Sequence, residues 1–352
     1  MKGETYAIET LNTLYEKTEP LSLGDDDRYI IFSDLHMGNG GRADDFRSNA
    51  EIFMRVLREY YLNAGYTLIL NGDVEELQRF SLDRIKKRWK GVYELFSEFE
   101  NAGRLYRLVG NHDLELLDYN HHGFDVHDAL RFQYEGNNIF IFHGHQTSPA
   151  FEKHHRLVSF ILRYFATPLK IRNYEVAHNS EKKFRTEKRA YEFASRRKIL
   201  SIIGHTHRPL FESMSKVDSI KFEIERLCRK YPGVSSEKKQ SIERKINQHK
   251  EELVHIQHTD EKDGSRASLY RENLVVPCTF NSGCVLGKRG MTALEIDAGE
   301  LALVHWFDRK RSRKYLNYDS YRAERLGESD YYRVVIKKDS LNYIMTRIKL
   351  LA

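Results

Sequence analysis

Short apolar runs alternate with longer stretches of helical spacing through the first 210 residues of the chain. The short runs are rich in β-branched and aromatic residues, as is typical of buried strands, and they lie at 28–33, 66–70, 105–109, 139–142 and 199–203. A further edge strand is predicted at 130–135. Apolar residues recur at helical spacing in 1–20, 44–63 and 83–101. This alternation predicts an α/β fold with a largely parallel inner sheet and covering helices.

Two segments interrupt this plan in the second half of the chain. Residues 149–198 are basic, aromatic and helix-rich, and residues 216–258 have the pattern of a Lys/Glu-rich helical hairpin with Pro232 and Gly233 at its tip. The sheet is expected to resume at 273–280 and to close with a hairpin at 292–307 that turns at 297–299. A last helix is predicted near 339–351. We therefore expect an N-terminal helical extension (1–27), one large domain (28–310) that carries both inserts, and a C-terminal extension (311–352).

Each of the five buried strands is followed by a cluster of polar side chains. The clusters contain Asp34 and His36; Asp73; Asn111, His112 and Asp113; His143; and His205 and His207. In open α/β sheets, ligands bind beyond the carboxyl ends of the strands, so these clusters should converge on one crevice.

Carboxylate and imidazole groups are ligands that suit Mn, Fe and Zn. Gly72 and Gly110 precede two of the clusters, and their missing side chains let the backbone approach a metal or phosphate. A lone Asp-x-His or Gly-His-Thr-His sequence would more often be structural, and a lone Gly-Asn-His-Asp could be a capped turn. Together they supply too many ligands for one tetrahedral ion, and they suit two ions about 3.5–4 Å apart that share a carboxylate.

Five short motifs carry a family resemblance: Ser33-Asp-Leu-His36, Asn71-Gly-Asp73, Gly110-Asn-His-Asp113, His143-Gly-His145 and Gly204-His-Thr-His207. They match the blocks of the calcineurin-like metallophosphoesterase superfamily over roughly 28–307. The resemblance implies a four-layer α/β/β/α sandwich with helical insertions. It also implies a hydrolase that uses two divalent metal ions, with Mn as the first choice and Fe, Zn, Ni and Mg as alternatives.

The resemblance also implies a role for each site residue. One metal would be held by Asp34, His36, Asp73 and His207, and the other by Asp73, Asn111, His143 and His205. Asp73 would then bridge the two ions. His112 resembles the residue that meets a phosphoryl or leaving oxygen in this family, and Asp113 resembles the partner that orients it.

Composition bounds the compartment and the surface chemistry. Hydrophobic residues make up 40% of the chain and charged residues 31%, which is typical of a soluble globular protein. The N-terminus lacks the apolar core of a signal peptide, and three cysteines are too few for a disulfide framework. We therefore expect a cytoplasmic protein. The net charge of +6 is mild, but Lys and Arg crowd 152–198. Such a segment suits a phosphate-bearing substrate or an anionic lipid surface, and a solvated helix face explains it equally well.

The superfamily acts on many phosphate esters and pyrophosphates, so the fold alone does not name the substrate. Residues 151–198, and 155–172 in particular, resemble the lid of UDP-2,3-diacylglucosamine pyrophosphatases. This resemblance predicts a nucleotide-diphosphate-lipid-like substrate and peripheral contact with the inner membrane surface. The chain departs from that group at two positions, because the group usually has Arg where His112 stands and Asp where His145 stands.

Other readings remain open at this point. The 155–172 stretch could instead be an ordinary helix whose apolar face packs on the domain. A metal-dependent nuclease or phosphodiesterase would set the same metals and the basic insert against nucleic acid or nucleotides. A protein phosphatase would need a peptide groove that nothing in the sequence marks. A non-catalytic scaffold would be expected to have lost a ligand, and all of the ligand positions are filled. The sequence does not predict an oligomeric state.

Overall fold

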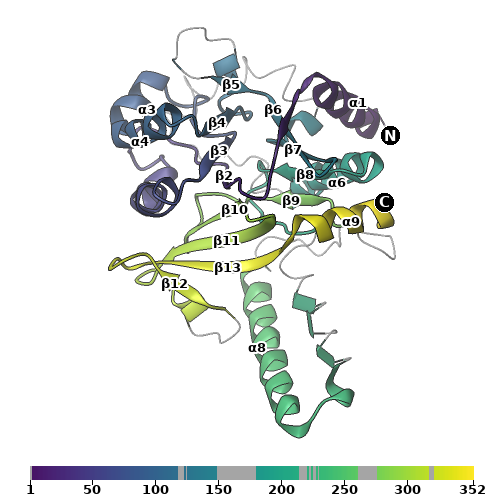
Figure 1. The fold of residues 1–352 in the computed structure, drawn as a ribbon. Helices are drawn as coiled ribbons and strands as arrows, with labels where there is room; N and C mark the ends of the chain where they lie inside the picture. Colours follow the sequence, from purple (N-terminus) through teal and green to yellow (C-terminus); the bar gives the residue numbers. More distant parts are fainter. Residues whose placement is uncertain are drawn as a thin grey trace.

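The computed structural model describes residues 2–117, 125–148, 180–213, 230–260, 276–316 and 321–352, together with positions 123, 220, 221, 223, 224, 227 and 228. Two β-sheets pack face to face, and helices cover their outer faces (Figure 1). This is the predicted four-layer α/β/β/α sandwich, and the fold class is confirmed.

The larger sheet has eight strands in the order β12-β13-β11-β10-β2-β3-β4-β5. Its strands are β2 (Tyr29–Phe32), β3 (Thr67–Asn71), β4 (Leu105–Leu108), β5 (Val126–His127), β10 (Met291–Asp297), β11 (Glu300–Asp308), β12 (Ala323–Arg325) and β13 (Tyr331–Ser340). Strands β2 to β5 run parallel, whereas β10, β11, β13 and β12 join antiparallel to their neighbours. The parallel arrangement predicted from strand–helix alternation in the first half of the chain holds for β2 to β5, and the other four strands are antiparallel. The cause is local, because β10 and β11 form the predicted hairpin with Ala298 and Gly299 as a left-handed two-residue turn.

The smaller sheet has five strands in the order β1-β6-β7-β8-β9. They are β1 (Pro20–Ser22), β6 (Ala129–Tyr134), β7 (Asn137–Phe142), β8 (Leu200–Ile203) and β9 (Thr279–Asn281). The predicted strands at 130–135, 139–142 and 199–203 are confirmed within two residues. Strands β7, β8 and β9 run parallel, so their carboxyl ends share one edge of the sheet.

Alternating side chains of the parallel strands divide the core into two. Ile31 and Ile69 belong to the cluster that also holds the apolar side chains of β6, β7 and β8, between the sheets. Ile30 and Leu68 belong to the cluster on the opposite face. The helices that cover the smaller sheet are α1 (Lys2–Lys17) and α6 (Ser180–Arg197), and those beside the larger sheet are α2 (Ala50–Arg55), α3 (Leu82–Arg88) and α4 (Lys90–Asn101).

Both chain termini are part of the sandwich. At the N-terminus, β1 pairs with β6, and α1 contributes Leu11 and Leu14 to the core. At the C-terminus, β13 pairs with β11 along nine residue pairs, and α9 (Leu341–Leu351) buries one apolar face. The segments predicted as extensions therefore add strands and helices to the same fold.

The two predicted inserts differ in what the structure describes. Residues 149–179, which include the stretch at 155–172, lie outside the described residues. Residues 180–197 form α6, whose Ala190, Phe193 and Ala194 are buried in the core. That part of the basic insert is thus a core helix. In the second insert, α8 (Ser236–Asp260) extends away from the sheets (Figure 1), and a 3₁₀ turn at Tyr231–Gly233 contains the Pro-Gly tip.

Within the described residues, no helix combines the length and apolar character required to cross a bilayer.

A buried ion pair in the larger sheet leads to a first prediction. Glu295 of β10 is 3% exposed, accepts a hydrogen bond from the Tyr61 hydroxyl at 2.6 Å, and pairs with Arg333 of β13. Glu295→Ala would leave the Arg333 guanidinium without its main counter-charge, so we expect the free energy of unfolding to fall by about 3–5 kcal/mol. Urea denaturation measures this.

The same hairpin supplies the control. Glu300 pairs with Lys338 at 2.7 Å, and both side chains are about half exposed. Glu300→Ala should change the free energy of unfolding by less than about 1 kcal/mol. Equal losses in the two variants would contradict the prediction.

Candidate active site

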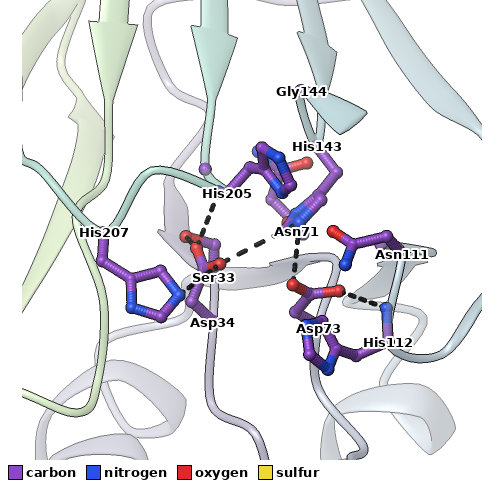
Figure 2. Close-up of polar contacts among 12 residues, drawn as sticks. Ser33, Asp34, Asn71, Asp73, Asn111, His112, His143, Gly144, His205 and His207 are labelled. Carbon is purple, nitrogen blue, oxygen red and sulfur yellow. Dashed lines mark hydrogen bonds and ion pairs between the residues drawn. The ribbon is translucent and has the colours of Figure 1, made fainter. Parts of the chain in front are cut away.

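The predicted ligands lie at the carboxyl ends of strands from both sheets. Asp34 and His36 follow β2, Asp73 follows β3 and Asn111 follows β4, while His143 follows β7 and His205 and His207 follow β8. Figure 2 shows the side chains of Asp34, Asp73, Asn111, His143, His205 and His207 converging, with Asn111 beside Asp73 and His112. Asp34 and His143 are fully buried, and His207 is the most open of the set at 18% side-chain exposure. The structure therefore brings together all of the residues that the sequence predicted as metal ligands.

The side chains fall into two groups, each compact enough to surround one ion. In the first, ligand atoms of Asp34, His36 and His207 lie within 4.8 Å of one another. In the second, the same holds for Asp73, His143 and His205. His207 Nε2 is 3.1 Å from Asp34 Oδ1, and His143 Nε2 is 3.1 Å from Asp73 Oδ2. Ligands of one divalent ion at bond lengths of about 2.0–2.2 Å are separated by distances of this order.

Asp73 lies between the two groups. Its Oδ2 atom is 3.1 Å from His143 Nε2 and 3.7 Å from His36 Nε2, which belong to different groups. Its Oδ1 atom accepts a hydrogen bond from the backbone N–H of His112 at 2.8 Å. One carboxylate oxygen is thus held by the backbone while the other faces both groups, the position that a bridging ligand requires.

Hydrogen bonds on the far side of the rings fix which nitrogen points inward. His143 Nδ1 is 2.7 Å from the carbonyl oxygen of Asn71, and His36 Nδ1 is 3.0 Å from Glu76 Oε2. In both rings Nε2 is left facing the carboxylates. Oδ2 of Asp34 accepts hydrogen bonds from Ser33 and from the backbone of His205. Such outer contacts orient metal-binding side chains and raise their basicity.

The backbone of the site is held in an uncommon conformation. Asp34, His36, Asp73, His205 and His207 all have φ between 47° and 64°, in the left-handed region that non-glycine residues rarely adopt. Gly110 packs so closely on Asp73, and Gly72 on His143, that a Cβ at either glycine would overlap its neighbour. Strain concentrated at five candidate ligands points to a function that requires it.

Charge in the site keeps the carboxylates ionised and divides the imidazoles between neutral and charged forms. Burial alone would raise the pKa of Asp73, but His143 and His112 hold it well below its usual range. Burial lowers the pKa of His205 to about 3, so this imidazole is neutral at pH 7. Burial also favours neutral His143, but Asp73 and Asp34 outweigh it and raise the pKa of His143 to about 9. Ionised carboxylates and neutral imidazoles are the forms that bind metal, and a cation would take the place of the His143 proton.

Two buried oxygens test whether this donor set fits a metal. Neither Asp34 Oδ1 nor Asn111 Oδ1 makes a hydrogen bond of good geometry within the described residues, although both are shielded from solvent. Asp34 Oδ1 faces the ring nitrogen of His207 at 3.1 Å. Buried oxygens without a well-formed hydrogen bond are rare in folded proteins. Both atoms belong to the predicted ligand set, and carboxylate, amide and imidazole donors suit divalent ions. The residues present therefore fit a two-metal centre.

Glu76 is a site residue that the sequence analysis missed. It is 7% exposed, and its two oxygens contact two different rings, His112 Nδ1 at 2.8 Å and His36 Nδ1 at 3.0 Å. Burial raises the pKa of Glu76, but the neighbouring His112 and His36 lower it to about 2, so the carboxylate is charged. The sequence did offer one signal for Glu76, because it is an acidic residue only three positions after Asp73, in the loop that follows β3.

The role expected for Asp113 is corrected by this contact. The sequence analysis made Asp113 the partner of His112, but Glu76 occupies the position beside His112 Nδ1. Asp113 instead accepts hydrogen bonds from the backbone N–H groups of Gly110 and Val74, both at 2.6 Å. The Asp113 carboxylate therefore ties the loop after β4 to the loop after β3.

A further network fixes the loop that carries His205 and His207. Thr206, between them, is fully buried, and its hydroxyl donates to Glu187 of α6 at 2.7 Å. The Asn281 amide donates to the same hydroxyl at 3.0 Å and to the Gly204 carbonyl at 2.9 Å. Helix α6 and strand β9 therefore hold the strained loop from two sides.

The geometry of Asp113 predicts a structural effect for Asp113→Asn. The amide would place an NH₂ group opposite a backbone N–H in a buried site, leaving donors without acceptors at about 1–3 kcal/mol each. We expect the metal-free protein to lose stability in urea and its manganese affinity, measured calorimetrically, to fall. Unchanged stability and affinity with slower turnover would instead make Asp113 the orienting partner of a catalytic group.

Comparisons with known proteins place this site in a family. The model of the calcineurin-like phosphoesterases matches residues 28–233. No curated protein matches the chain. Among solved structures, the chain is similar to the phosphoesterase YfcE from E. coli, with 12% identity, 90% of this chain and 100% of that chain covered, and a TM-score of 0.36. It is also similar to a cold-active protein-tyrosine phosphatase of a psychrophilic Shewanella species, with 10% identity, 82% and 80% covered, and a TM-score of 0.35. With its family match over more than half its length and the motif residues gathered in one site, the chain belongs to the calcineurin-like phosphoesterases, hydrolases that act on phosphoester bonds.

Proposed function

We propose that the protein hydrolyses a phosphoester or pyrophosphate bond at a centre of two divalent metal ions that share Asp73. The observation that supports this most directly is the position of Asp73 Oδ2, which faces a histidine of each ligand group. In this proposal Asp34, His36 and His207 complete one site, and Asn111, His143 and His205 complete the other. When bound, the two ions would activate water as the nucleophile and neutralise charge on the phosphoryl oxygens. Manganese is the first candidate from the family resemblance, and the oxygen and nitrogen donors also suit iron, zinc, nickel and magnesium.

His112 is the proposed proton donor to the leaving oxygen. Its Nδ1 atom lies 2.8 Å from Oε1 of the charged Glu76, which fixes the orientation of the ring, and Nε2 is the nitrogen proposed to donate. Glu76 also contacts His36, so one carboxylate would set the orientation of the donor and of a metal ligand together. This shared contact supports a direct geometric link between the acid and the first metal.

Two substrate classes are candidates, a lipid-like pyrophosphate and a phosphodiester. The lipid-like pyrophosphate of the sequence analysis, and membrane contact with it, depend on residues 151–172, which lie outside the described residues. The phosphodiester alternative is favoured by a basic surface in the described part of the chain, taken up below. A panel of aryl phosphate mono- and diesters, UDP-sugars with and without acyl chains, and DNA, assayed with manganese-loaded protein, would separate these classes.

Asp73→Asn tests the shared metal centre. An amide in place of the bridging carboxylate removes the negative charge that two cations would share, so we expect loss of activity and a fall from two bound ions to one or none. Elemental analysis of the dialysed protein measures the ions. Asn111→Ala should weaken mainly one of the two ions. A wild-type protein with one ion at saturation and full activity would contradict the proposal.

His112→Ala and Glu76→Gln test the proton donor. His112→Ala should retain both ions and lower turnover by about 10²–10⁴-fold, the usual scale for positioned acid catalysis. Glu76→Gln keeps the shape but removes the charge beside the ring, so it should lower turnover by less and move the pH profile. The effect should shrink for a substrate whose leaving group needs no proton, such as p-nitrophenolate. Loss of metal in His112→Ala would show that this residue is a ligand.

A further inference from the structure

A basic pocket lies at the end of β11, outside the proposed metal centre. Five of the six residues from 309 to 314 are Arg or Lys. The pocket has a volume of about 500 Å³ and is lined by Arg309, Lys310, Arg313, Leu316 and Tyr332. Tyr332 stacks on the buried Phe307 ring at 5.8 Å, so the aromatic wall of the pocket is fixed in place.

The cations of this pocket exceed the anions that face it. Arg309 and Lys310 share a single carboxylate, Asp330, at 2.6 Å and 2.5 Å. Arg313 is exposed, and its side chain has no hydrogen bond or ion pair within the described part of the chain. Asp308 also acts on Lys310, so three cations face two carboxylates, and the pocket keeps a net positive charge that would attract a phosphate.

The pocket and the metal ligands share one edge of the eight-stranded sheet. The register pairs Ile31 with Leu294, Met291 with Trp306, and Asp308 with Tyr331. The carboxyl ends of β2 and β11 and the start of β13 therefore lie along that edge. Three strand spacings separate β2 from β13, which is roughly 15 Å.

A chain of hydrogen bonds connects the basic segment 309–314 with Asp34 of the proposed metal centre. Arg311 donates to the side-chain oxygen of Asn49 at 2.6 Å, and the amide of Asn49 donates to the carbonyl oxygens of Val285 and Gly287. The backbone N–H of Val285 in turn donates to the carbonyl oxygen of Asp34 at 3.4 Å. The basic segment is thus held on the same rim as the proposed metal centre.

We propose that this pocket is a second phosphate-binding site, and that it holds another phosphate of the same substrate molecule. The inference rests on the proposed function, because it takes the scissile phosphate to lie at Asp34 and Asp73. The roughly 15 Å between β2 and β13 is longer than a pyrophosphate, and it is long enough to hold several phosphates of an extended nucleic-acid strand. The substrate class is then a single-stranded nucleic acid, with Arg309, Lys310 and Arg313 on its backbone and Tyr332 against a base or sugar.

Arg313→Gln tests the site with substrates of different length. The assay uses the manganese-loaded full chain with a labelled oligothymidylate of about 12 nucleotides, the dinucleotide, and bis(p-nitrophenyl) phosphate. The KM for the long substrate should rise about tenfold more than for the two short ones, and its salt slope should fall by about one. The matched control is Lys349→Gln, an equal loss of charge at an exposed position of α9, which should change none of these values.

A binding measurement makes the outcome independent of cleavage. In the Asp73→Asn background, fluorescence anisotropy should show that the long oligonucleotide binds and that Arg313→Gln weakens this binding about tenfold. Equal effects of Arg313→Gln on short and long substrates would overturn the second site. So would hydrolysis of the small diester without binding of the oligonucleotide, which would leave the proposed function intact, or binding of phosphatidylserine vesicles in its place. Failure to hydrolyse any phosphoester would instead overturn the proposed function.

Discussion

Two carboxylates buried among imidazoles are the constraint on which the site depends. Asp34 and Asp73 are at most 1% exposed, and each remains charged because histidines surround it. Isolated buried charges of this kind are costly, and the protein compensates them partly through His143, which Asp73 and Asp34 hold in its charged form. Divalent cations would complete that compensation. Bound cations would therefore both neutralise the buried carboxylates and supply the chemistry at the edge of the sheets.

The sandwich supplies the rigidity that this arrangement demands. Strands of both sheets end at the site, so side chains from β2, β3 and β4 meet those from β7 and β8 without a long loop. Five candidate ligands adopt left-handed backbone conformations that the chain would avoid in isolation. Backbone N–H groups bound to Asp113, and the Thr206 hydroxyl bound to Glu187, hold those turns in place. Asp113, Thr206 and Glu187 thus set the positions of the side chains that are proposed to bind the metals.

The sequence analysis brought the candidate ligands to one place better than it predicted the residues that support them, for a physical reason. Each ligand follows a buried strand, and strand ends can be read from local hydrophobic pattern, so Asp34, Asp73 and His143 could be placed in one crevice. Glu76 and Asp113 are both acids near a ligand, and which of them contacts His112 depends on how two loops fold over each other. Periodicity carries no information about that choice. Likewise, the sequence predicted the hairpin of β10 and β11 but not its antiparallel pairing with β2, because that pairing joins segments more than 250 residues apart.

The antiparallel half of the sheet has a consequence for recognition. Because β10 and β11 form a hairpin, their turn at Ala298 and Gly299 lies at the edge remote from the metal ligands. The chain must then return along β11 and leave it at the catalytic edge, at Asp308. Whatever side chains occupy the next loop are therefore presented beside the site, and in this chain they are mainly Arg and Lys. If β11 ran parallel to β10, it would end at the opposite edge, and the loop that follows it would lie far from the site. Topology, rather than proximity in sequence, puts the basic loop where a long phosphate-bearing chain leaving the metal centre would meet it.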